Sequence, residues 1–358
     1  KKLEQIIKNY KNKKVLVTGS TGFKGSWLCY WLYHLGAKVV GVALKPEKSS
    51  ILFKELNLKN KIKQKTINIQ DFKKINQLIK KEKPHIIFHL AAQSIVSLSY
   101  QKPLETIRTN ILGSANILES IRINNVPNLV YITSDKCYLN LDKKSSYKET
   151  DYLGGIDNYS SSKASAEIIF RSYLNSYRIK NKSHLNFASA RAGNVIGGGD
   201  MKDNRLIPDI IKSIKRKGKI NLRNPRATRP WQHVLEPLSG YLILGEKLMN
   251  KKLRSSIYPC WNFGPEKKNC KPVKKVVDKF LIYFSKKNKV KILKNKKKFH
   301  ESKYLSLNIS KAKKELQWKP RLSFNETLKL TSDWYKHYLD KNKVEKITID
   351  QIKYFTKK

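Results

Sequence analysis

The sequence predicts an α/β protein in which a doubly wound parallel sheet carries a smaller C-terminal lobe. Strand and helix patterns alternate along the first half of the 358 residues, as is typical of a parallel sheet covered by helices on both faces. A glycine-rich turn follows the first strand. Beyond Ala192 the alternation breaks, and the chain becomes glycine-rich, irregular and basic. A chain of this length can form two substantial structural units.

The elements of the first half are expected in a regular order. Apolar stretches predict five strands, at 15–17, 39–44, 66–69, 86–90 and 129–133. Helices are expected between them, at 23–35, from about residue 71, and after Pro103, where proline suits a first helical turn. A further helix is expected at 234–249.

The turn after the first strand contains Gly19, Gly22 and Gly25, which lead directly into a helix. Backbone N–H groups in such a turn face a pyrophosphate, and the helix dipole favours its negative charge. The spacing is GxxGxxG rather than GxGxxG, and a tight structural turn is the alternative interpretation. The context predicts a Rossmann-type dinucleotide-binding domain.

No acidic residue follows the second strand, where 43–46 reads Ala-Leu-Lys-Pro. An acid at this place usually binds the adenosine ribose of NAD. Lys45 could instead meet a 2′-phosphate, so these residues leave NAD and NADP both open. Asn68 and Ile69, at the expected end of the third strand, are candidates for contacting adenine, with an ordinary strand end as the alternative.

Two short motifs predict acid–base chemistry. Tyr159 and Lys163 are four residues apart and share one helix face, where an ammonium would lower the pKa of the phenol. A surface pair is the alternative. Ser134, Asp135 and Lys136 follow the fifth strand, at the edge where open α/β sheets bind ligands. A plain alcohol dehydrogenase needs no such carboxylate and amine, so oxidation here is expected to prepare a harder step.

The charge is strongly positive, with 75 Lys and Arg against 27 Asp and Glu, a net +48. Such a balance favours a nucleic-acid or anionic-membrane partner. The lysines, however, are spread along the chain, and clusters such as 294–298 carry no interleaved aromatic residues. A compositional bias towards Lys, Asn and Ile explains the charge better. We therefore expect no nucleic-acid partner.

The cysteine and histidine spacings predict neither a disulfide nor a metal site. Four cysteines contain no CxxC pair, and seven histidines contain no HExxH spacing. No stretch approaches the ~18 apolar residues of a membrane span, and the N-terminus lacks a signal-peptide core. We expect a cytoplasmic protein with no membrane-bound part.

The motifs extend into a longer pattern. The matching stretches are 18–27, 89–93, 133–138, 190–200, 205–209 and 229–236. With them the chain resembles the extended short-chain dehydrogenase/reductase enzymes that act on nucleotide sugars, and within these the CDP-glucose 4,6-dehydratases, over roughly residues 13–338. Related dTDP-glucose enzymes carry Asp-Glu where this chain has Asp135-Lys136, which favours the cytidine nucleotide.

The resemblance implies an internal redox cycle with NAD that serves deoxysugar biosynthesis. Tyr159 would take the proton of the sugar 4-hydroxyl as hydride leaves C4, with Ser134 bonded to O4. A base would then remove the C5 proton, water would leave C6 with Asp135 as general acid, and the hydride would return to C6. Lys136 stands in place of the family's glutamate base. It could act as that base, or stay charged while water or another group takes the proton.

The resemblance also implies binding residues. Cofactor contacts are expected from Gly19, Thr21, Gly22, Phe23, Gly25, Asn68, Ile69, Leu90, Ala91, Ala92, Tyr159 and Lys163. Substrate contacts are expected from Gln93, Asn194, Arg205, Arg226, Arg229 and His233. Arginine forks suit phosphate oxygens, although Arg226 could be an ordinary surface residue. A homodimer or homotetramer is expected by analogy. The alternatives are another nucleotide-sugar dehydratase or epimerase, or a non-catalytic RNA-binding relative.

These expectations divide the chain. Residues 1–192 are predicted to form the NAD-binding domain, with 232–258 returning to it. Residues 193–231 and 259–340 are predicted to form the nucleotide-sugar-binding lobe, and 341–358 a polar tail.

Overall fold

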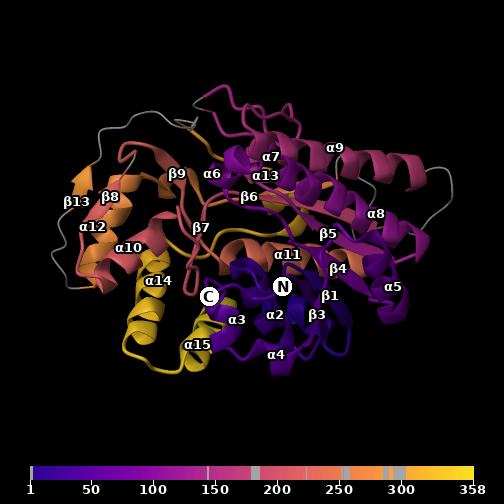
Figure 1. Cartoon of the computed structure of the whole chain (residues 1–358), viewed down its shortest axis with the longest axis horizontal. Helices are drawn as coiled ribbons and strands as arrows, with labels where there is room; N and C mark the ends of the chain where they lie inside the picture. Colours follow the sequence, from indigo (N-terminus) through magenta and orange to yellow (C-terminus); the bar gives the residue numbers. More distant parts are fainter. Residues whose placement is uncertain are drawn as a thin grey trace.

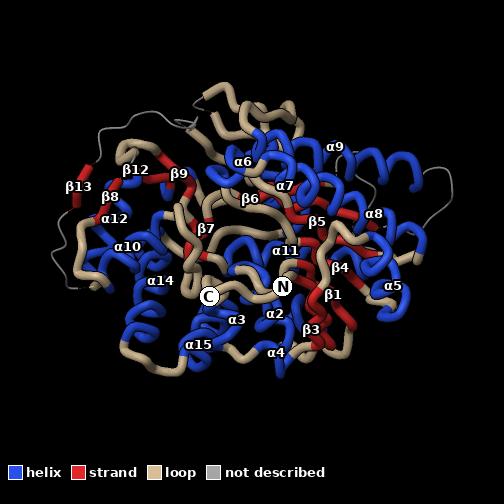
Figure 2. Tube along the Cα trace, viewed as in Figure 1, coloured by secondary structure: helices blue, strands red, loops and turns tan. Residues whose placement is uncertain are grey.

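A computed structural model describes residues 3–142, 145–178, 186–222, 224–250, 253, 259–284, 290–292 and 304–358. Its centre is a seven-stranded sheet in the order β11-β6-β5-β4-β1-β2-β3, and every neighbouring pair is parallel (Figures 1 and 2). The strands are β1 (Lys14–Thr18), β2 (Lys38–Ala43), β3 (Lys63–Thr66), β4 (Ile86–His89), β5 (Asn128–Ile132), β6 (Asn186–Ala192) and β11 (Cys260–Phe263). The predicted doubly wound α/β fold is confirmed.

Helices cover both faces of this sheet because its strands are apolar on both sides. Leu16 of β1 packs with one layer, whereas Val15 and Val17 pack with the other. The first layer consists of α5 (Phe72–Glu82), α8 (Gly113–Ile123) and α9 (Asn158–Arg178). The second consists of α1 (Leu3–Ile7), α2 (Phe23–His34), α3 (Ile51–Glu55), α4 (Leu58–Lys61) and α11 (Leu235–Met249).

Shorter segments complete this part of the chain. The helix expected after Pro103 is three consecutive segments, in which α7 and a π-helix lead into α8. The remaining elements are η1 (Lys8–Tyr10), α6 (Val96–Gln101), α7 (Pro103–Ile107), η2 (Arg108–Leu112) and η3 (Asp135–Cys137).

A smaller lobe lies beside the sheet, at the left of Figure 1. Its strands form three separate pairs, β10 with β7, β12 with β9, and β13 with β8. Its elements are β7 (Val195–Ile196), α10 (Leu206–Lys215), β8 (Ile220–Leu222), β9 (Thr228–Pro230), β10 (Gln232–His233), η4 (Lys267–Asn269), β12 (Cys270–Pro272), α12 (Val273–Tyr283), β13 (Val290–Ile292) and α14 (Phe324–Leu339). The helix α13 (Ser310–Leu316) instead packs on β11 of the main sheet.

Two expectations about strands need correction. Residues 260–263 were assigned to the lobe, but they form β11, the edge strand of the main sheet, paired with β6. The third strand is 63–66 rather than 66–69, because Lys-Gln-Lys-Thr forms a polar edge strand that pairs with β2 without an apolar pattern. Asn68 and Ile69 therefore lie in the loop that follows this strand.

The polar tail predicted at 341–358 forms a helix that packs on the rest of the molecule. Residues 344–357 form α15 (Val344–Lys357), whose Phe355 is fully buried. The Phe355 ring lies edge-on to Trp31 of α2, with 6.0 Å between ring centroids. The last residues therefore belong to the same core as the cofactor-side helix α2.

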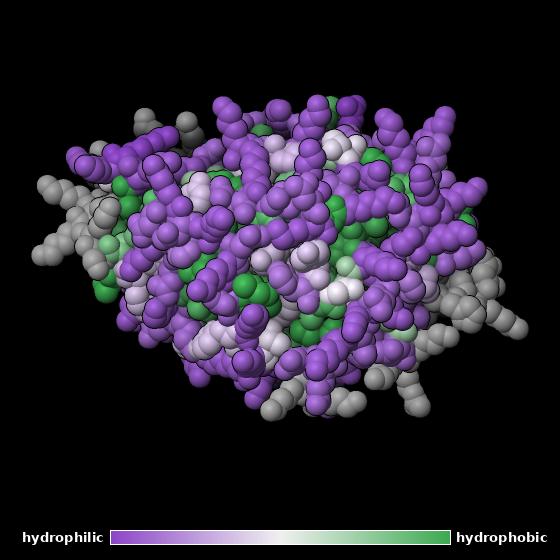
Figure 3. Space-filling model, turned by 90° about the horizontal axis from the view of Figure 1, so that it is seen from below, coloured by the Kyte–Doolittle hydropathy of each residue, from purple (hydrophilic) through white to green (hydrophobic). Residues whose placement is uncertain are grey.

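The surface shown in Figure 3 is predominantly hydrophilic, with small separate apolar patches. Within the described residues, no helix is long and apolar enough to span a membrane, and no three His, Cys, Asp or Glu side chains are grouped as metal ligands would be. The lysine cluster at 294–298 lies outside the described residues.

Candidate active site

A cavity of about 580 Å³ lies at the carboxyl ends of the central strands and is bordered by the lobe. It brings together most of the residues that the sequence singled out. These are Gly19, Thr21, Gly22, Phe23, Gly25, Asn68, Ile69, Leu90, Ala91, Ala92, Ser134, Asp135, Lys136, Tyr159, Lys163, Asn194 and Arg205. Residues distant in the chain thus meet at one sheet edge, as expected for an open α/β sheet.

The glycine turn forms a cradle that larger residues would fill. Gly19 has φ +74°, and a Cβ there would lie 2.9 Å from the backbone nitrogen of Ala91. A Cβ on Gly25 would lie 2.0 Å from the carbonyl oxygen of Gly19. Among the described residues no side chain caps the start of α2 at Gly22, so the first N–H groups of this helix can bind a ligand. This arrangement fits the pyrophosphate of a dinucleotide.

Tyr159 and Lys163 are both buried at the start of α9, with the Lys163 Nζ 5.9 Å from the centroid of the Tyr159 ring. Burial and nearby Asp135 raise the pKa of Tyr159 to about 12, although Ser134 and Arg205 act in the opposite direction. Burial lowers the pKa of Lys163 to about 8. The expected lowering of the phenol pKa is therefore wrong for this structure, because desolvation outweighs the nearby cations.

Ser134 and Asp135 lie where β5 ends and η3 begins. The Ser134 hydroxyl donates to Asp135 Oδ1 at 3.0 Å, whereas the buried Oδ2 has no hydrogen-bond partner among the described residues. A Cβ on Gly193 would lie 2.8 Å from this Oδ2, so glycine is needed for the carboxyl to occupy its place. Burial raises the pKa of Asp135, against the pull of Lys136, Ser134, Lys24 and Arg229. The environment favours the protonated acid.

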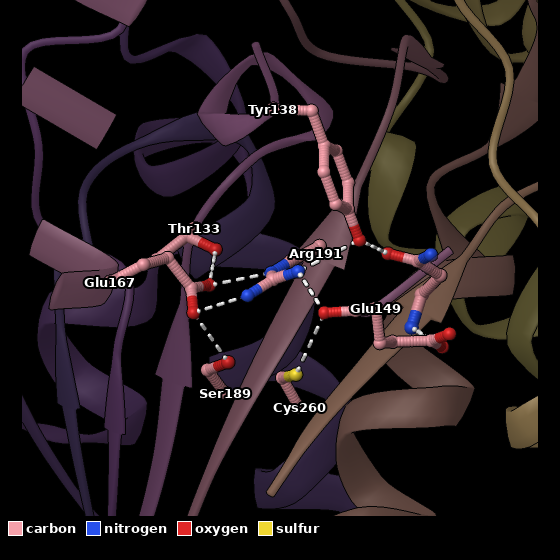
Figure 4. A network of polar contacts seen from close by, with 8 residues as sticks. Thr133, Tyr138, Glu149, Glu167, Ser189, Arg191 and Cys260 are labelled. Carbon is pink, nitrogen blue, oxygen red and sulfur yellow. Dashed lines mark hydrogen bonds and ion pairs between the residues drawn. The ribbon is translucent and has the colours of Figure 1, made fainter. Parts of the chain in front are cut away.

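A buried ion pair supports the strand that carries these residues (Figure 4). Arg191 of β6 donates from Nε to Glu167 Oε1 at 3.0 Å and from Nη2 to Oε2 at 2.9 Å, and both side chains are fully buried. Glu167 also accepts from Thr133 at 2.5 Å and from Ser189 at 3.0 Å. The ion pair therefore ties α9 to β6, and the Thr133 hydroxyl ties the same carboxylate to the residue that follows β5.

The same network continues to the far side of η3. Arg191 Nη1 donates to the Tyr138 hydroxyl at 2.8 Å and to the Glu149 carbonyl at 3.3 Å. The Tyr138 hydroxyl donates to Asn262 Oδ1 at 2.8 Å, and the Asn262 backbone N–H donates to Glu149 Oε1 at 2.9 Å. Both flanks of the Ser134–Lys136 segment are thus held by hydrogen bonds.

The expected substrate residues divide into two groups. Asn194 and Arg205 line the cavity, and Arg205 is held by Asp200 at 2.9 Å and by the Ser94 hydroxyl at 2.8 Å. Arg229 lies outside the lining, although its charge lowers the pKa of Asp135. Gln93, Arg226 and His233 are not part of the lining.

These last three side chains have other surroundings. Gln93 donates to the Thr106 hydroxyl at 2.9 Å and accepts from the Ile95 N–H at 2.5 Å, so it holds its own loop. Arg226 is exposed. His233 is fully buried beside Trp27, with ring centroids 6.1 Å apart, and burial lowers its pKa to about 3. The structure contradicts its expected substrate contact, because β10 carries it into the core.

Two cavity residues were missed by the sequence analysis. Lys24 lies in the quoted glycine motif, and its position in the first turn of α2 is the only signal that could have indicated it. Glu47 lies one residue beyond the window searched for a ribose acid. Its Oε2 accepts from Lys202 and, at 2.9 Å, from Ser49, and the bond from Lys202 lowers the pKa of Glu47.

A doubly wound sheet, a glycine cradle after β1 and a Tyr-x-x-x-Lys pair on α9 together define an extended short-chain dehydrogenase/reductase. Comparison with known protein families refines this class. The model of the GDP-mannose 4,6-dehydratase family matches residues 16–331, and the chain belongs to this family.

Individual relatives fall in the same group. The CDP-glucose 4,6-dehydratase of Salmonella typhimurium is 44% identical over 281 residues, which cover 77% of this chain and 78% of that protein. The dTDP-D-glucose 4,6-dehydratase of Dictyostelium discoideum is 27% identical, over 66% of this chain and 56% of that protein.

Solved structures share the fold. The epimerase Mth375 of Methanothermobacter thermautotrophicus superposes with a TM-score of 0.82 at 24% identity, covering 96% of this chain and 97% of that one. The dTDP-glucose 4,6-dehydratase of Bacillus anthracis, solved in complex with NAD, superposes with a TM-score of 0.77 at 22% identity, covering 92% and 99%.

Proposed function

We propose that the protein is an NAD-dependent CDP-glucose 4,6-dehydratase that forms CDP-4-dehydro-6-deoxyglucose and water. The observation that carries this proposal is the meeting of Asp135 and Lys136 with Tyr159 and Lys163 in one cavity. An enzyme that only oxidises or epimerises C4 needs no acid to expel a hydroxyl. The 44% identity to the Salmonella enzyme supports the choice of nucleotide.

The glycine cradle is the proposed holder of the NAD pyrophosphate, with Asn68 and Ile69 towards adenine. Glu47 is the candidate for the ribose hydroxyls, since a carboxylate accepts hydrogen bonds from hydroxyls and repels a 2′-phosphate. When bound, NAD accepts hydride from C4 of the sugar and later returns it to C6. NAD therefore suits this cavity better than NADP.

Tyr159 is the proposed base for the 4-hydroxyl, with Ser134 as the hydrogen-bond partner of the same oxygen. A phenol with a pKa of about 12 ionises only with help from nearby positive charge. Arg205 already acts in this direction, and the Lys163 ammonium, 5.9 Å from the centroid of the Tyr159 ring, is the proposed further source of such charge. After Tyr159 accepts the 4-hydroxyl proton, it keeps this proton for as long as the sugar carries a ketone at C4.

Asp135 is the proposed acid for water loss, since burial raises the pKa of its carboxyl and so favours the protonated form. The C5 hydrogen becomes acidic once C4 is a ketone, and its loss forms the C5–C6 double bond as the C6 oxygen leaves. Lys136 lines the same cavity, and we assign it to the C5 step. It acts there either as the base or as the cation that stabilises the enolate.

Asn194 and Arg205 are the proposed contacts for the sugar and the nucleotide diphosphate, with Arg229 nearby. We also propose a homodimer or homotetramer that pairs through α9 and the helices α7 and η2 packed against it. Apolar side chains are exposed on three helices that pack together there, at Leu104, Leu112 and Ile168. We place the reaction in the cytoplasm, where NAD and nucleotide sugars are available.

The test is to incubate the purified protein with NAD and, separately, with CDP-glucose, dTDP-glucose, UDP-glucose or GDP-mannose. The readout is the alkaline absorbance of a 4-keto-6-deoxy sugar. Product from CDP-glucose alone is expected. Product from another nucleotide sugar would overturn the substrate, and C4 epimerisation without the keto sugar would favour the epimerases of the same fold. Salt-dependent RNA retention without turnover would favour a binding protein.

A further inference from the structure

Lys24 is a cavity residue that the proposed reaction leaves without a task. It is the second residue of α2, directly after the glycine cradle, and its half-buried side chain lines the cavity. The backbone of this turn serves the pyrophosphate, but a lysine side chain extends well beyond its own backbone. Lys24 lines the same cavity as Asp135, Lys163 and Arg205, and the charges of these three residues act on its ammonium.

Lys24 and Asp135 both have unused hydrogen-bonding capacity. Among the described residues, the Lys24 ammonium makes no hydrogen bond or ion pair, and Asp135 Oδ2 is buried without a partner. Each nevertheless affects the charge of the other. A buried polar atom without a partner is unfavourable for stability, so the unpartnered Oδ2 of Asp135, in a cavity that Lys24 also lines, indicates a functional use.

We propose that Lys24 is a positioning residue for water loss, whose ammonium stabilises the carboxylate that Asp135 becomes when it protonates the leaving oxygen. This inference rests on the proposed dehydratase function and assigns a task within it. Lys24 acts through Asp135 rather than on the reacting atoms.

The step balances as follows. The C5–H electron pair becomes the C5–C6 double bond, the C5 proton goes to the base, and the C6–O bond breaks with its electrons on oxygen. The Asp135 O–H proton joins that oxygen to give water, which leaves a buried carboxylate. A buried anion is costly unless a cation is nearby, so Lys24 lowers the energy of this state.

Other groups around Asp135 also affect its charge. Ser134, Lys136 and Cys137 belong to its own segment. The others are Arg229 of β9, Tyr159 of α9, Tyr241 of α11 and Lys24 of α2. Burial, Arg205 and Lys163 lower the pKa of Lys24 to about 8, against the pull of Asp135. Among the cations, Lys24 is therefore one that loses its charge near neutral pH. Its assistance should therefore decline as pH rises through about 8.

The decisive experiment compares two leaving groups in single turnovers of the NAD-loaded enzyme. Water loss from CDP-glucose needs a proton, whereas fluoride loss from CDP-6-deoxy-6-fluoroglucose does not. Lys24→Met should slow the disappearance of NADH with CDP-glucose by about tenfold to 100-fold, and leave it within about twofold with the fluoro substrate. Lys24→Arg should restore most of the rate and extend it above pH 8.

The controls separate this role from others. Damage to the fold or to NAD binding would slow both substrates equally, and that result would overturn the proposal. In an Asp135→Asn background Lys24→Met should have little further effect, because the two act as one unit. A tenfold loss of rate on adding Lys24→Met to the Asp135→Asn variant would also contradict the proposed role of Lys24. A wild-type protein that turns over neither substrate would instead refute the dehydratase function itself.

Discussion

Two groups of buried charges lie on either side of the same strand end, and they are arranged in opposite ways. On one side, Glu167 and Arg191 form a bidentate ion pair, and Thr133 and Ser189 complete the hydrogen bonds of the carboxylate (Figure 4). On the other side, two residues beyond Thr133, Asp135 has an unpartnered oxygen within the described part of the chain. The two carboxyls are similarly buried.

The difference shows that burial alone does not decide what a charged group does. Burial raises the pKa of both carboxyls, but Arg191 and the hydroxyls of Thr133 and Ser189 bring the pKa of Glu167 below its ordinary value. Asp135 lacks such partners, and its pKa stays raised. A satisfied network holds the structure in place, whereas an unsatisfied acid keeps a proton to give. Substitutions on the two sides should therefore affect different properties.

The largest effect is expected at Tyr159. Tyr159→Phe removes the group that accepts the 4-hydroxyl proton, so the rate should fall about 1,000-fold to 10,000-fold. The free energy of unfolding should change little. Absorbance of NADH after mixing with CDP-glucose measures the first oxidation, and NADH accumulation on this variant would contradict the assigned role.

In the Glu167–Arg191 network, Arg191→Met should lower the stability of the fold rather than change one step of the reaction. It leaves Glu167 buried without its cation, which should reduce the free energy of unfolding by about 3–5 kcal/mol. Urea denaturation measures this loss. The matched control is Arg122→Met, which breaks a partly exposed Arg–Glu pair on α8 and should remove less than about 1 kcal/mol. Equal losses of unfolding free energy in the two variants would show that the buried ion pair contributes no more to stability than the exposed one.

On the cavity side, Asp135→Asn should affect one step of the reaction. Water loss should slow about 100-fold while hydride removal from C4 continues, so NADH should accumulate on the enzyme. Stability should stay within about 0.5 kcal/mol of the wild type, because no ion pair is broken. An unchanged overall rate would exclude Asp135 as the acid.

The smallest effect tests whether a raised carboxyl pKa marks a catalytic residue by itself. Glu236 of α11 is buried away from the cavity and accepts the N–H groups of Arg321 at 2.8 Å and Leu322 at 2.6 Å. Burial raises its pKa to about 7, although these two bonds act in the opposite direction. The unfolded chain ionises near pH 4.5, so Glu236 makes the folded protein less stable as pH rises from about 4.5 to 7.

Glu236→Gln keeps an acceptor for both N–H groups but cannot ionise. Its stability gain should be about 1–2 kcal/mol at pH 8 and should disappear towards pH 4.5. Urea denaturation at the two pH values measures the difference, and turnover should be unaffected. A pH-independent gain would show that ionisation of Glu236 is not involved.

The sequence predicted those parts of the fold that depend on local pattern. The strands around 15–17, 86–90 and 129–133 were readable because buried parallel strands are apolar runs. β3 was misplaced because a polar edge strand is defined by its hydrogen bonds to β2. β11 was assigned to the wrong unit because its pairing with β6 is a contact between distant parts of the chain.

The same distinction applies to the site. Ser134 and Asp135 were predictable because residues after a parallel strand lie at the ligand-binding edge. The burial of His233 was not predictable, since this side chain packs beside Trp27 of α2, which is far away in the sequence. Lys24 was overlooked because the direction of a side chain in the first turn of a helix depends on packing that no local pattern reveals.

The contact between Phe355 and Trp31 has a practical consequence for anyone preparing shorter versions of the protein. The composition of 341–358 suggests a dispensable end, yet removing it would expose an indole on the helix that begins at the glycine cradle. A version shortened at residue 340 should therefore aggregate more readily and retain nucleotide less well. Purification tags are better placed at the other end, or separated from Lys358 by a flexible spacer.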